Sequence, residues 1–429
     1  MKHSIITRSP KQFFLLFIFA LIVAALSSCS HSANKSSEEK TAGNGLPAVL
    51  RFKKQTLIDK EGTGKECATF LAPEGWKVDA SVRWNINDVQ LPATTSVIIA
   101  DEKSGRMLQG FPNSVYLVST DPDMAEEFPA GSKLYAAKIL NVKPTVADLI
   151  KSEIIPAYRN MNDVKVTSEK DLSVSEANHN QSSYYKNTDS KSGMVSIEYE
   201  ENGKEMEENI FGTITTMAVD QYTQYVYLSM CYGCKAPKGE LKNVMGIYET
   251  VLNSVKTNPQ WSATFNQVAM MVMKKAFNGG GNYNGGGQNG YNDQYGYNGG
   301  GNNYNGNGGG SGGGGYASGN FGSLNDYIGA ASNYSSDASM SAYENQQRSE
   351  DRVFESYSDQ MLGYQNYTDP NSGDVSKLPS GYENAWTDNS GNYVLSNGGY
   401  DPNTSGSTSS WTPLETGGST SDAGSGGDQ

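Results

Sequence analysis

Val195-Ser196-Ile197-Glu198-Tyr199-Glu200 leads through Glu201 to Asn202-Gly203, and a second strand-like run from Lys204 to Phe211 follows directly. Apolar and polar side chains alternate in the first run, as they do in a strand with one buried face. Asn-Gly supplies the two residues with positive φ that a type I′ turn requires. The sequence therefore predicts an antiparallel hairpin at this point.

Further strand-like runs lie on both sides of this hairpin. They cover residues 96–100, 115–119, 164–167, 212–219 and 222–230. Short connections rich in turn-forming residues separate several of them, and short turns join antiparallel strands. We therefore expect an antiparallel sheet.

A helix is expected from Val146 to Met161, where apolar residues recur at helical spacing. Thr145 and Asp148 form a start that resembles a capping box. Pro156 should kink this helix, because proline lacks the amide donor and clashes with the preceding turn.

Two more helices are expected towards the end of the same region. One covers about 240–255, with an apolar stripe that should face the core. The other begins with Asn258 as its N-cap and Pro259 at its first position. Strands followed by helices in this order predict one α+β domain over 46–277, with an antiparallel sheet flanked by helices.

Two segments of this domain carry a family resemblance. Phe70-Leu71-Ala72-Pro73-Glu74-Gly75-Trp76 is similar to the opening of the PsbP-like family of extracytoplasmic and extrinsic-subunit domains. The amphipathic helix that ends at Leu252-Asn253-Ser254-Val255-Lys256 resembles that family's closing element. The resemblance covers residues 66–256. It implies a PsbP-like sandwich with a binding or assembly role, and it supplies no catalytic residues.

The N-terminus has the pattern of a bacterial lipoprotein signal. Three basic residues precede an apolar run from Phe13 to Leu26, which is shorter than the roughly 20 residues of a spanning helix. Leu26-Ser27-Ser28-Cys29 resembles a lipobox, so residues 1–28 should be removed and Cys29 acylated. Ser30 at the following position favours the outer membrane in a bacterium with two membranes; otherwise we expect the outer face of the cell membrane. Residues 29–45 should form a flexible tether.

The net charge of −13 is unevenly distributed. Residues 278–429 contain 3 Lys+Arg and 16 Asp+Glu, which leaves 30 charges of each sign in residues 1–277. Nucleic-acid binding requires clustered basic residues, so this composition argues against it.

The C-terminal third should comprise a linker, a small module and a tail. Residues 278–320 are rich in Gly, Asn and Tyr and are expected to be disordered. Residues 341–414 should form a helix and a small aromatic module that is held away from the main domain, with a hairpin whose arms are 386–388 and 393–395. Residues 415–429 should be a disordered tail.

Two kinds of binding residue are candidates in this module. Trp386, Tyr393 and Trp411 could stack on the rings of glycans, or form the module's own core. Asp369, Asn371 and Asp374 offer oxygen ligands at nearby positions, as calcium loops do. Asx-turns explain the same three residues without a metal.

The cysteines allow several interpretations. Cys231-Tyr232-Gly233-Cys234 has the spacing of a thiol oxidoreductase motif, although no helix begins directly after it. In an extracytoplasmic protein a structural disulfide is favoured, between Cys231 and Cys234 or between either of them and Cys67. The same three cysteines with His179 could instead form a zinc site.

The sequence thus favours a lipid-anchored envelope protein that binds or assembles without being an enzyme and without a cofactor. Its expected partners are the membrane, through the anchor, and an envelope protein or glycan. The alternatives are a thiol-disulfide protein that uses Cys231 and Cys234, and a surface adhesin whose C-terminal module binds glycan or calcium.

Overall fold

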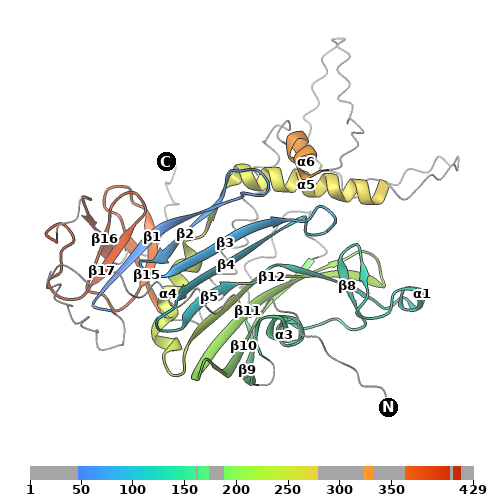
Figure 1. Cartoon of the computed structure of the whole chain (residues 1–429), viewed down its shortest axis with the longest axis horizontal. Helices are drawn as coiled ribbons and strands as arrows, with labels where there is room; N and C mark the ends of the chain where they lie inside the picture. The colour runs from blue at the N-terminus through green and yellow to red at the C-terminus, as the bar shows by residue number, and fades with distance from the viewer. Residues whose placement is uncertain are drawn as a thin grey trace, which may run out of the picture. The chain divides into compact units, whose positions relative to one another are not determined.

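The computed structural model describes residues 47–160, 163–172, 188–278, 323–331, 363–405 and 409–416 (Figure 1). All of them belong to the compact unit that begins at Thr41. The fold is mixed α+β, with two large curled sheets, one small three-stranded sheet and few helices. Several expected features lie outside the described residues. They are Cys29 with the rest of segment 1–46, most of the expected linker within 279–322, the segment 332–362, and the expected tail from residue 417 onward.

The large sheet is built around the expected hairpin. The order of its main strands is β3-β4-β5-β12-β11-β10-β9, and β6, β7 and β8 join at its side. The bounds are β3 Lys77–Trp84, β4 Ala93–Asp101, β5 Arg106–Gly110, β6 Ser114–Ser119, β7 Lys133–Leu134, β8 Ala137–Leu140, β9 Lys165–Leu172, β10 Thr188–Glu201, β11 Lys204–Ala218 and β12 Thr223–Pro237. All neighbours pair antiparallel except β6 with β8.

The turn between β10 and β11 has the predicted form. Asn202 and Gly203 have φ angles of 53° and 74°, and Glu201 pairs with Lys204. The register continues unbroken from there to Thr188 and Met217. The hairpin prediction is confirmed, and its strands run further than the sequence pattern indicated, because β11 includes the run expected as a separate strand at 212–219.

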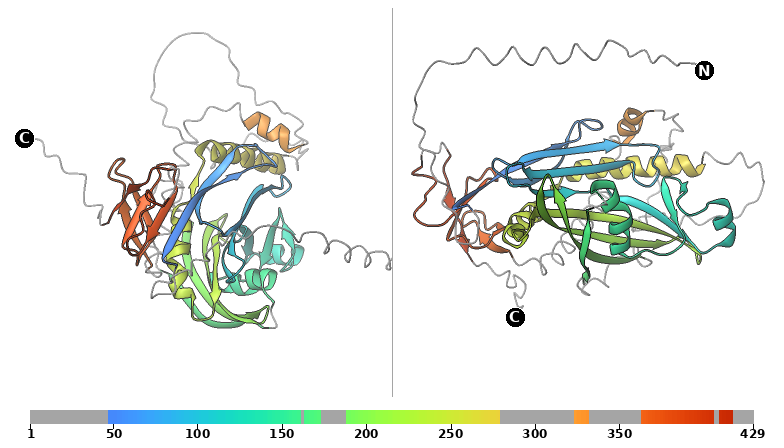
Figure 2. Two further views of the ribbon diagram at one scale, coloured as in Figure 1. Left: turned by 60° about the vertical axis from the view of Figure 1, so that its left-hand side comes forward. Right: turned by 60° about the horizontal axis from the view of Figure 1, so that its bottom comes forward.

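The second sheet joins the two ends of the chain. Its order is β13-β2-β1-β17-β16-β18, with β1 Val49–Ile58, β2 Glu66–Pro73, β13 Lys256–Thr257, β16 Asn384–Thr387, β17 Tyr393–Ser396 and β18 Thr412–Pro413. Val49 pairs with Ser396 and Phe52 with Tyr393. Figure 2 shows the C-terminal strands beside β1.

The expected separation of the C-terminal module from the main domain is therefore wrong for residues 363–416. The predicted hairpin is present as β16 and β17, but β17 completes the sheet of β1. A smaller sheet, β15-β14-β19, completes this segment, with β14 Tyr364–Thr368, β15 Val375–Pro379 and β19 Glu415–Thr416. The prediction failed because two strands pair through main-chain N–H and C=O groups, which almost every residue carries. The side-chain pattern of the sequence therefore does not indicate which distant strand pairs with β1.

The first expected helix is present with an internal change of pitch. It consists of α2 Val146–Leu149, a π-helical turn Ile150–Ile154 and α3 Ile155–Tyr158. The capping box of Thr145 and Asp148 is complete. Pro156 is the second residue of α3, two positions after the π turn, and its missing amide donor disturbs the regular ladder in this region. A short helix, α1 Pro122–Glu127, precedes it with Asp121 as its N-cap.

The other two expected helices are α4 Leu241–Asn253 and α5 Pro259–Asn278. Asn258 accepts a hydrogen bond from the Gln260 amide at 2.9 Å, which confirms its capping role. A further helix that the sequence did not predict, α6 Leu324–Ala331, packs on α5 through Val268, Val272 and Tyr327. The helix expected within 341–362 lies outside the described residues.

The buried carboxylate of Asp59 ties α5 to the sheets. It accepts hydrogen bonds from the indole nitrogens of Trp84 and Trp261 and from the amides of Gly62 and Thr63. Burial acts to raise the pKa of Asp59, but these donors outweigh it and lower the pKa. Within the described ranges, no helix has the length and apolar character needed to cross a membrane.

Candidate functional site

The most concentrated polar chemistry in the described residues is a buried ion pair between Arg159 and Glu208. Arg159 follows the last turn of α3, and Glu208 lies in β11. The guanidinium binds the carboxylate in a bidentate manner, with Nε to Oε2 at 2.7 Å and Nη2 to Oε1 at 2.5 Å. The side chains are 7% and 0% exposed. A two-point contact of this kind fixes both orientation and distance.

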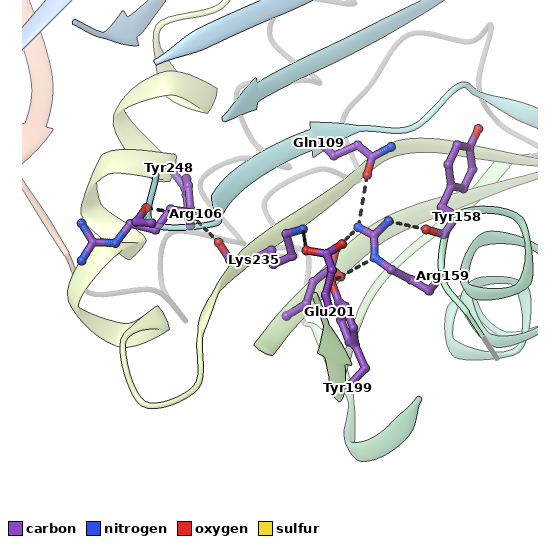
Figure 3. Close-up of polar contacts among 10 residues, drawn as sticks. Arg106, Gln109, Tyr158, Arg159, Tyr199, Glu201, Lys235 and Tyr248 are labelled. Carbon is purple, nitrogen blue, oxygen red and sulfur yellow. Dashed lines mark hydrogen bonds and ion pairs between the residues drawn. The ribbon is translucent and has the colours of Figure 1, made fainter. Parts of the chain in front are cut away.

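Further hydrogen bonds surround this ion pair, as Figure 3 shows for Gln109, Tyr158 and Arg159. Arg159 Nη2 donates to Gln109 Oε1 at 3.1 Å, and Nη1 donates to the Tyr158 carbonyl at 2.7 Å. The Tyr199 hydroxyl donates to Glu208 Oε2 at 2.9 Å. We call Arg159, Glu208, Tyr199 and Gln109 the charged centre.

Burial and charge shift the pKa values of Arg159 and Tyr199. Burial alone would lower the pKa of Arg159, but the hydrogen bond and negative charge of Glu208 raise it well above its ordinary value. Burial, and then the charge of Glu208, raise the pKa of the Tyr199 hydroxyl far above neutrality. Arg159 therefore stays charged and Tyr199 stays protonated throughout the physiological range.

Gly233 makes room for the carboxylate of Glu208. A Cβ atom at this position would lie 2.2 Å from Glu208 Oε1 and 3.2 Å from the ring of Phe111. Real atoms do not approach so closely, so a glycine is required here. Within Cys231-Tyr232-Gly233-Cys234, the residue that serves the charged centre is thus the glycine.

A second buried cation lies one position beyond Cys234 on β12. Lys235 is 5% exposed and donates to Glu201 Oε2 at 2.6 Å. Its backbone carbonyl accepts a hydrogen bond from the Tyr248 hydroxyl of α4. These contacts connect the hairpin, β12 and α4, and Figure 3 shows Lys235 beside Glu201.

The charged centre can position secondary structure, but its geometry does not suit it to act on a substrate. Its carboxylate is fully buried and engaged by both Arg159 and Tyr199, so it offers no free base. A buried pair costs desolvation energy that hydrogen bonds must offset, and here four bonds from the guanidinium and one from Tyr199 contribute to this. Its role is to hold the end of α3 against β11.

The sequence prediction missed the charged centre, although part of it left a signal. Met206, Glu208 and Ile210 occupy alternate positions of β11, so a glutamate stands in the apolar face of a strand. Such a residue requires a buried cation. Nothing in the sequence indicates that the cation is Arg159, because it lies in a different element 49 positions away.

The three described cysteines are separate, free and buried. Cys231 lies in the apolar cluster that includes α2 and the π turn, whereas Cys234 and Cys67 lie in the cluster that includes α4. Cys231 and Cys234 therefore face opposite sides of the sheet. The expected structural disulfide between them is absent among the described residues, because a strand directs the two side chains apart.

Burial also opposes thiol chemistry at these cysteines. It raises the pKa of Cys67 to about 12, and it raises the pKa values of Cys231 and Cys234 well above their usual range. A reactive cysteine needs a lowered pKa and access to solvent. No group of possible metal ligands occurs among the described residues, and His179 of the hypothetical zinc set lies outside them.

Of the candidate aromatic residues of the C-terminal segment, Tyr393 packs against the largest core cluster, which also includes residues of α4. Trp386 is 8% exposed and packs edge-on against Tyr400, with ring centroids 6.5 Å apart. The Tyr393 hydroxyl bonds Ser376, and the Trp411 amide donates to Asn403. A groove of about 560 Å³ beside β16 and β18 is lined by Trp386 but by neither of the other two.

The three calcium candidates form a turn between β14 and β15. Asp369 Oδ1 accepts from the Asn371 amide at 2.8 Å, and the Asp369 amide donates to the Asp374 carbonyl at 2.9 Å. This is the Asx-turn that the sequence allowed as the alternative. The same pattern recurs at Asp388 and Asp401, each of which accepts from an amide two positions later.

No family model matches this chain, and no curated protein matches it. Among solved structures, the chain has a weak similarity to LpqN of Mycobacterium tuberculosis, a protein described as involved in cell envelope biogenesis. The two share 11% identity over 48% of this chain and 92% of LpqN, with a TM-score of 0.22. A likeness of this size carries no argument about function.

Proposed function

We propose that this protein is a lipid-anchored, extracytoplasmic module of the bacterial cell envelope that binds or assembles other envelope components. The observation that carries the proposal is Leu26-Ser27-Ser28-Cys29 directly after an uncharged apolar run. Acylation of Cys29 would bring about 0.8 kcal/mol of membrane affinity per buried CH₂. The tether after Cys29 leads to Pro47, where the described fold begins.

A non-enzymatic role is the second part of the proposal. The charged centre is buried and bound by its own hydrogen bonds, and the three described thiols are buried with raised pKa values. These features stabilise a fold and do not favour the thiol-disulfide alternative. Binding through the protein surface is the function that such a rigid, mainly antiparallel framework serves best.

The PsbP-like resemblance forms the third part of the proposal. Its two ends are in contact, because Trp76 packs edge-on against Tyr248 of α4 with ring centroids 6.1 Å apart. Gly75 has a φ of 86°, and the Pro-x-Gly-Trp segment forms the turn between β2 and β3. These contacts support the family assignment as a proposal.

Metabolic labelling with a palmitate analogue tests the anchor. The wild-type chain should be labelled and should sediment with membranes, whereas Cys29→Ala should lose both properties. Cys67→Ala is the matched control, since it removes a cysteine inside the fold and should leave labelling intact. Equal labelling of wild type and Cys29→Ala would overturn the proposed anchor.

Native gel electrophoresis of envelope extracts in mild detergent tests the assembly role. The wild-type chain should migrate in a complex larger than the free mature chain. Migration as a free monomer in these extracts would contradict the assembly proposal and leave the anchor proposal standing.

A further inference from the structure

Helix α4 and strand β15 pack against each other although they are far apart in the sequence, as Figure 1 shows. Tyr248 of α4 and Leu378 of β15 are fully buried and belong to the largest core cluster. A Cβ atom on Gly246 would lie 2.1 Å from the carbonyl oxygen of Gly363, which directly precedes β14, so only a glycine admits the approach of that backbone. Side chains that meet across this contact are therefore held in one arrangement.

A lysine and an asparagine meet across this contact. Lys377 Nζ of β15 lies 3.5 Å from Asn253 Oδ1, which belongs to the last residue of α4. Asn253 Nδ2 donates a hydrogen bond to the backbone carbonyl of Glu249 at 2.9 Å, and this bond fixes the plane of the carboxamide. Both side chains are half-buried. The amine is thus adjacent to a carboxamide that is itself held in place.

The carboxyl group of Glu249 lies beside this pair. Glu249 precedes Asn253 by four positions, so the two side chains share one face of α4. The residue is fully buried. Burial raises its pKa to about 8, whereas a hydrogen bond from the Gly363 amide and the charge of Lys377 act to lower it. Lys377 is thus close enough for its charge to act on this carboxyl group, which can accept and return a proton near neutral pH.

An amine, a carboxamide and a carboxyl group in this arrangement can exchange one amide for another. The carboxylate of Glu249 takes a proton from Lys377, and the uncharged Nζ attacks Asn253 Cγ. The Nζ–Cγ bond forms and the Cγ–Nδ2 bond breaks. The amine loses two protons in all: one completes the ammonia that leaves with Nδ2, and the other converts it into ammonium. No oxidant, reductant or cofactor is required.

We propose that Lys377 and Asn253 are joined by an isopeptide bond between Nζ and Cγ, and that Glu249 transfers the proton during its formation. Folding brings the two reacting groups together, which replaces an encounter in solution by a reaction within one molecule. The bond ties β15 covalently to α4 and closes a long loop of the chain, which restricts the unfolded state. It concerns how the chain holds itself together, and it does not depend on the lipid anchor or on a binding partner.

Trypsin digestion of the purified full chain, followed by mass spectrometry, tests the bond. Trypsin cleaves after a lysine only while the side-chain amine is free, so the chain should resist cleavage after Lys377. Peptide 243–256, which contains Asn253, should be recovered joined to peptide 353–429, with a mass lower than their sum by one ammonia molecule. Recovery of 243–256, 353–377 and 378–429 as separate peptides, with Asn253 unmodified, would overturn the proposal.

Two variants remove the reacting groups one at a time. Lys377→Arg keeps the positive charge without a primary amine, and Asn253→Ala removes the carboxamide; both should give separate peptides. Lys256→Arg is the matched control, because it changes an exposed lysine near the end of α4 and keeps the trypsin site. It should give the joined peptides at the wild-type yield. Joined peptides in Lys377→Arg would overturn the assignment of the lysine.

The role of Glu249 is tested with two variants that cannot transfer the proton. Glu249→Gln and Glu249→Met should both give separate peptides 243–256 and 353–377. Circular dichroism of each variant should match that of the wild type, so that loss of the bond reflects lost chemistry and not a lost fold. Joined peptides at the wild-type yield in both variants would overturn the role of Glu249 in forming the bond.

Discussion

Replacement of Arg159 by methionine provides the sharpest test of the charged centre. The change keeps much of the side-chain length and removes the guanidinium that holds Glu208 at 2.7 and 2.5 Å. Glu208 is 0% exposed and, of its described side-chain donors, would keep the Tyr199 hydroxyl. The variant therefore places a nearly uncompensated carboxylate inside the sheet.

The expected cost follows from the burial of both partners. Removing one member of a buried pair destabilises a protein by about 3–5 kcal/mol, since the remaining charge has lost its solvent and its partner. Tyr199 continues to donate, so we expect a value near the lower limit, about 3 kcal/mol. With a urea m-value of about 2–3 kcal/mol per M, the unfolding midpoint should fall by about 1–1.5 M.

Urea unfolding followed by tryptophan fluorescence measures this change. Lys238→Met is the matched control, because it removes a cation that is paired with Glu198 at the exposed surface, and its midpoint should be almost unchanged. The double variant Arg159→Met/Glu208→Gln removes the stranded charge. It should recover at least half of the loss, because the amide oxygen that replaces the carboxylate can still accept from Tyr199.

Two results would refute this reasoning. A midpoint for Arg159→Met equal to that of Lys238→Met would mean that Glu208 is solvated or protonated at little cost. A double variant that loses as much as the sum of both single variants would mean that the two residues act independently, which their bidentate contact does not allow.

Three further predictions concern other parts of the fold. Gly246→Ala should lower the unfolding temperature, because the new Cβ atom would lie 2.1 Å from the Gly363 carbonyl oxygen. Gly329→Ala should hold or raise this temperature, because its new Cβ atom would have no other atom within 4 Å. Calorimetry compares the two variants, and equal shifts would show that α4 and Gly363 are not in contact. Asp59→Asn should cost about 1.5–3 kcal/mol at neutral pH. The lowered pKa of Asp59 stabilises the fold above about pH 4, and this contribution is lost as the pH falls below that value. The variant should therefore lose less stability than the wild type between about pH 5 and 2. Parallel plots of unfolding free energy against pH would contradict the prediction. Residues 47–429, a segment that excludes Cys29, should react with a thiol reagent only after unfolding. Three thiols should then be titrated, those of Cys67, Cys231 and Cys234. Fewer than three titrated thiols in the absence of reductant would indicate a disulfide.

The predicted elements that the structure confirms depend on local chemistry. Asn202 and Gly203 form the hairpin turn because they tolerate positive φ, and the side chains of Thr145, Asp148 and Asn258 cap their own helices. Pro156 accompanies a π turn in the helix that it is expected to kink. Each of these effects acts within a few residues, so it can be deduced from neighbours in the chain.

The expectations that the structure corrects depend on how a strand directs its side chains and on which distant segments meet. Cys231 and Cys234 have the spacing of a disulfide motif, but both lie within β12, where they face opposite clusters. The C-terminal segment was expected to stand apart because its charge and composition differ from those of the main domain. Charge distribution describes solubility and partners, and it does not determine which strand pairs with β1.

The amino-acid order of this chain is sufficient to identify the hairpin, the helix starts, the Asx-turns and the lipobox-like signal, since each depends on side chains a few positions apart. The tertiary structure alone reveals that Arg159 neutralises Glu208, that Gly233 makes room for it and that β17 closes the edge of β1. Ion pairs and strand pairing across long separations depend on how elements pack, and backbone hydrogen bonds form between strands of almost any composition. Glu249 illustrates the difference: in the sequence it is one more glutamate of a helix, and its burial follows only from the segment that covers it.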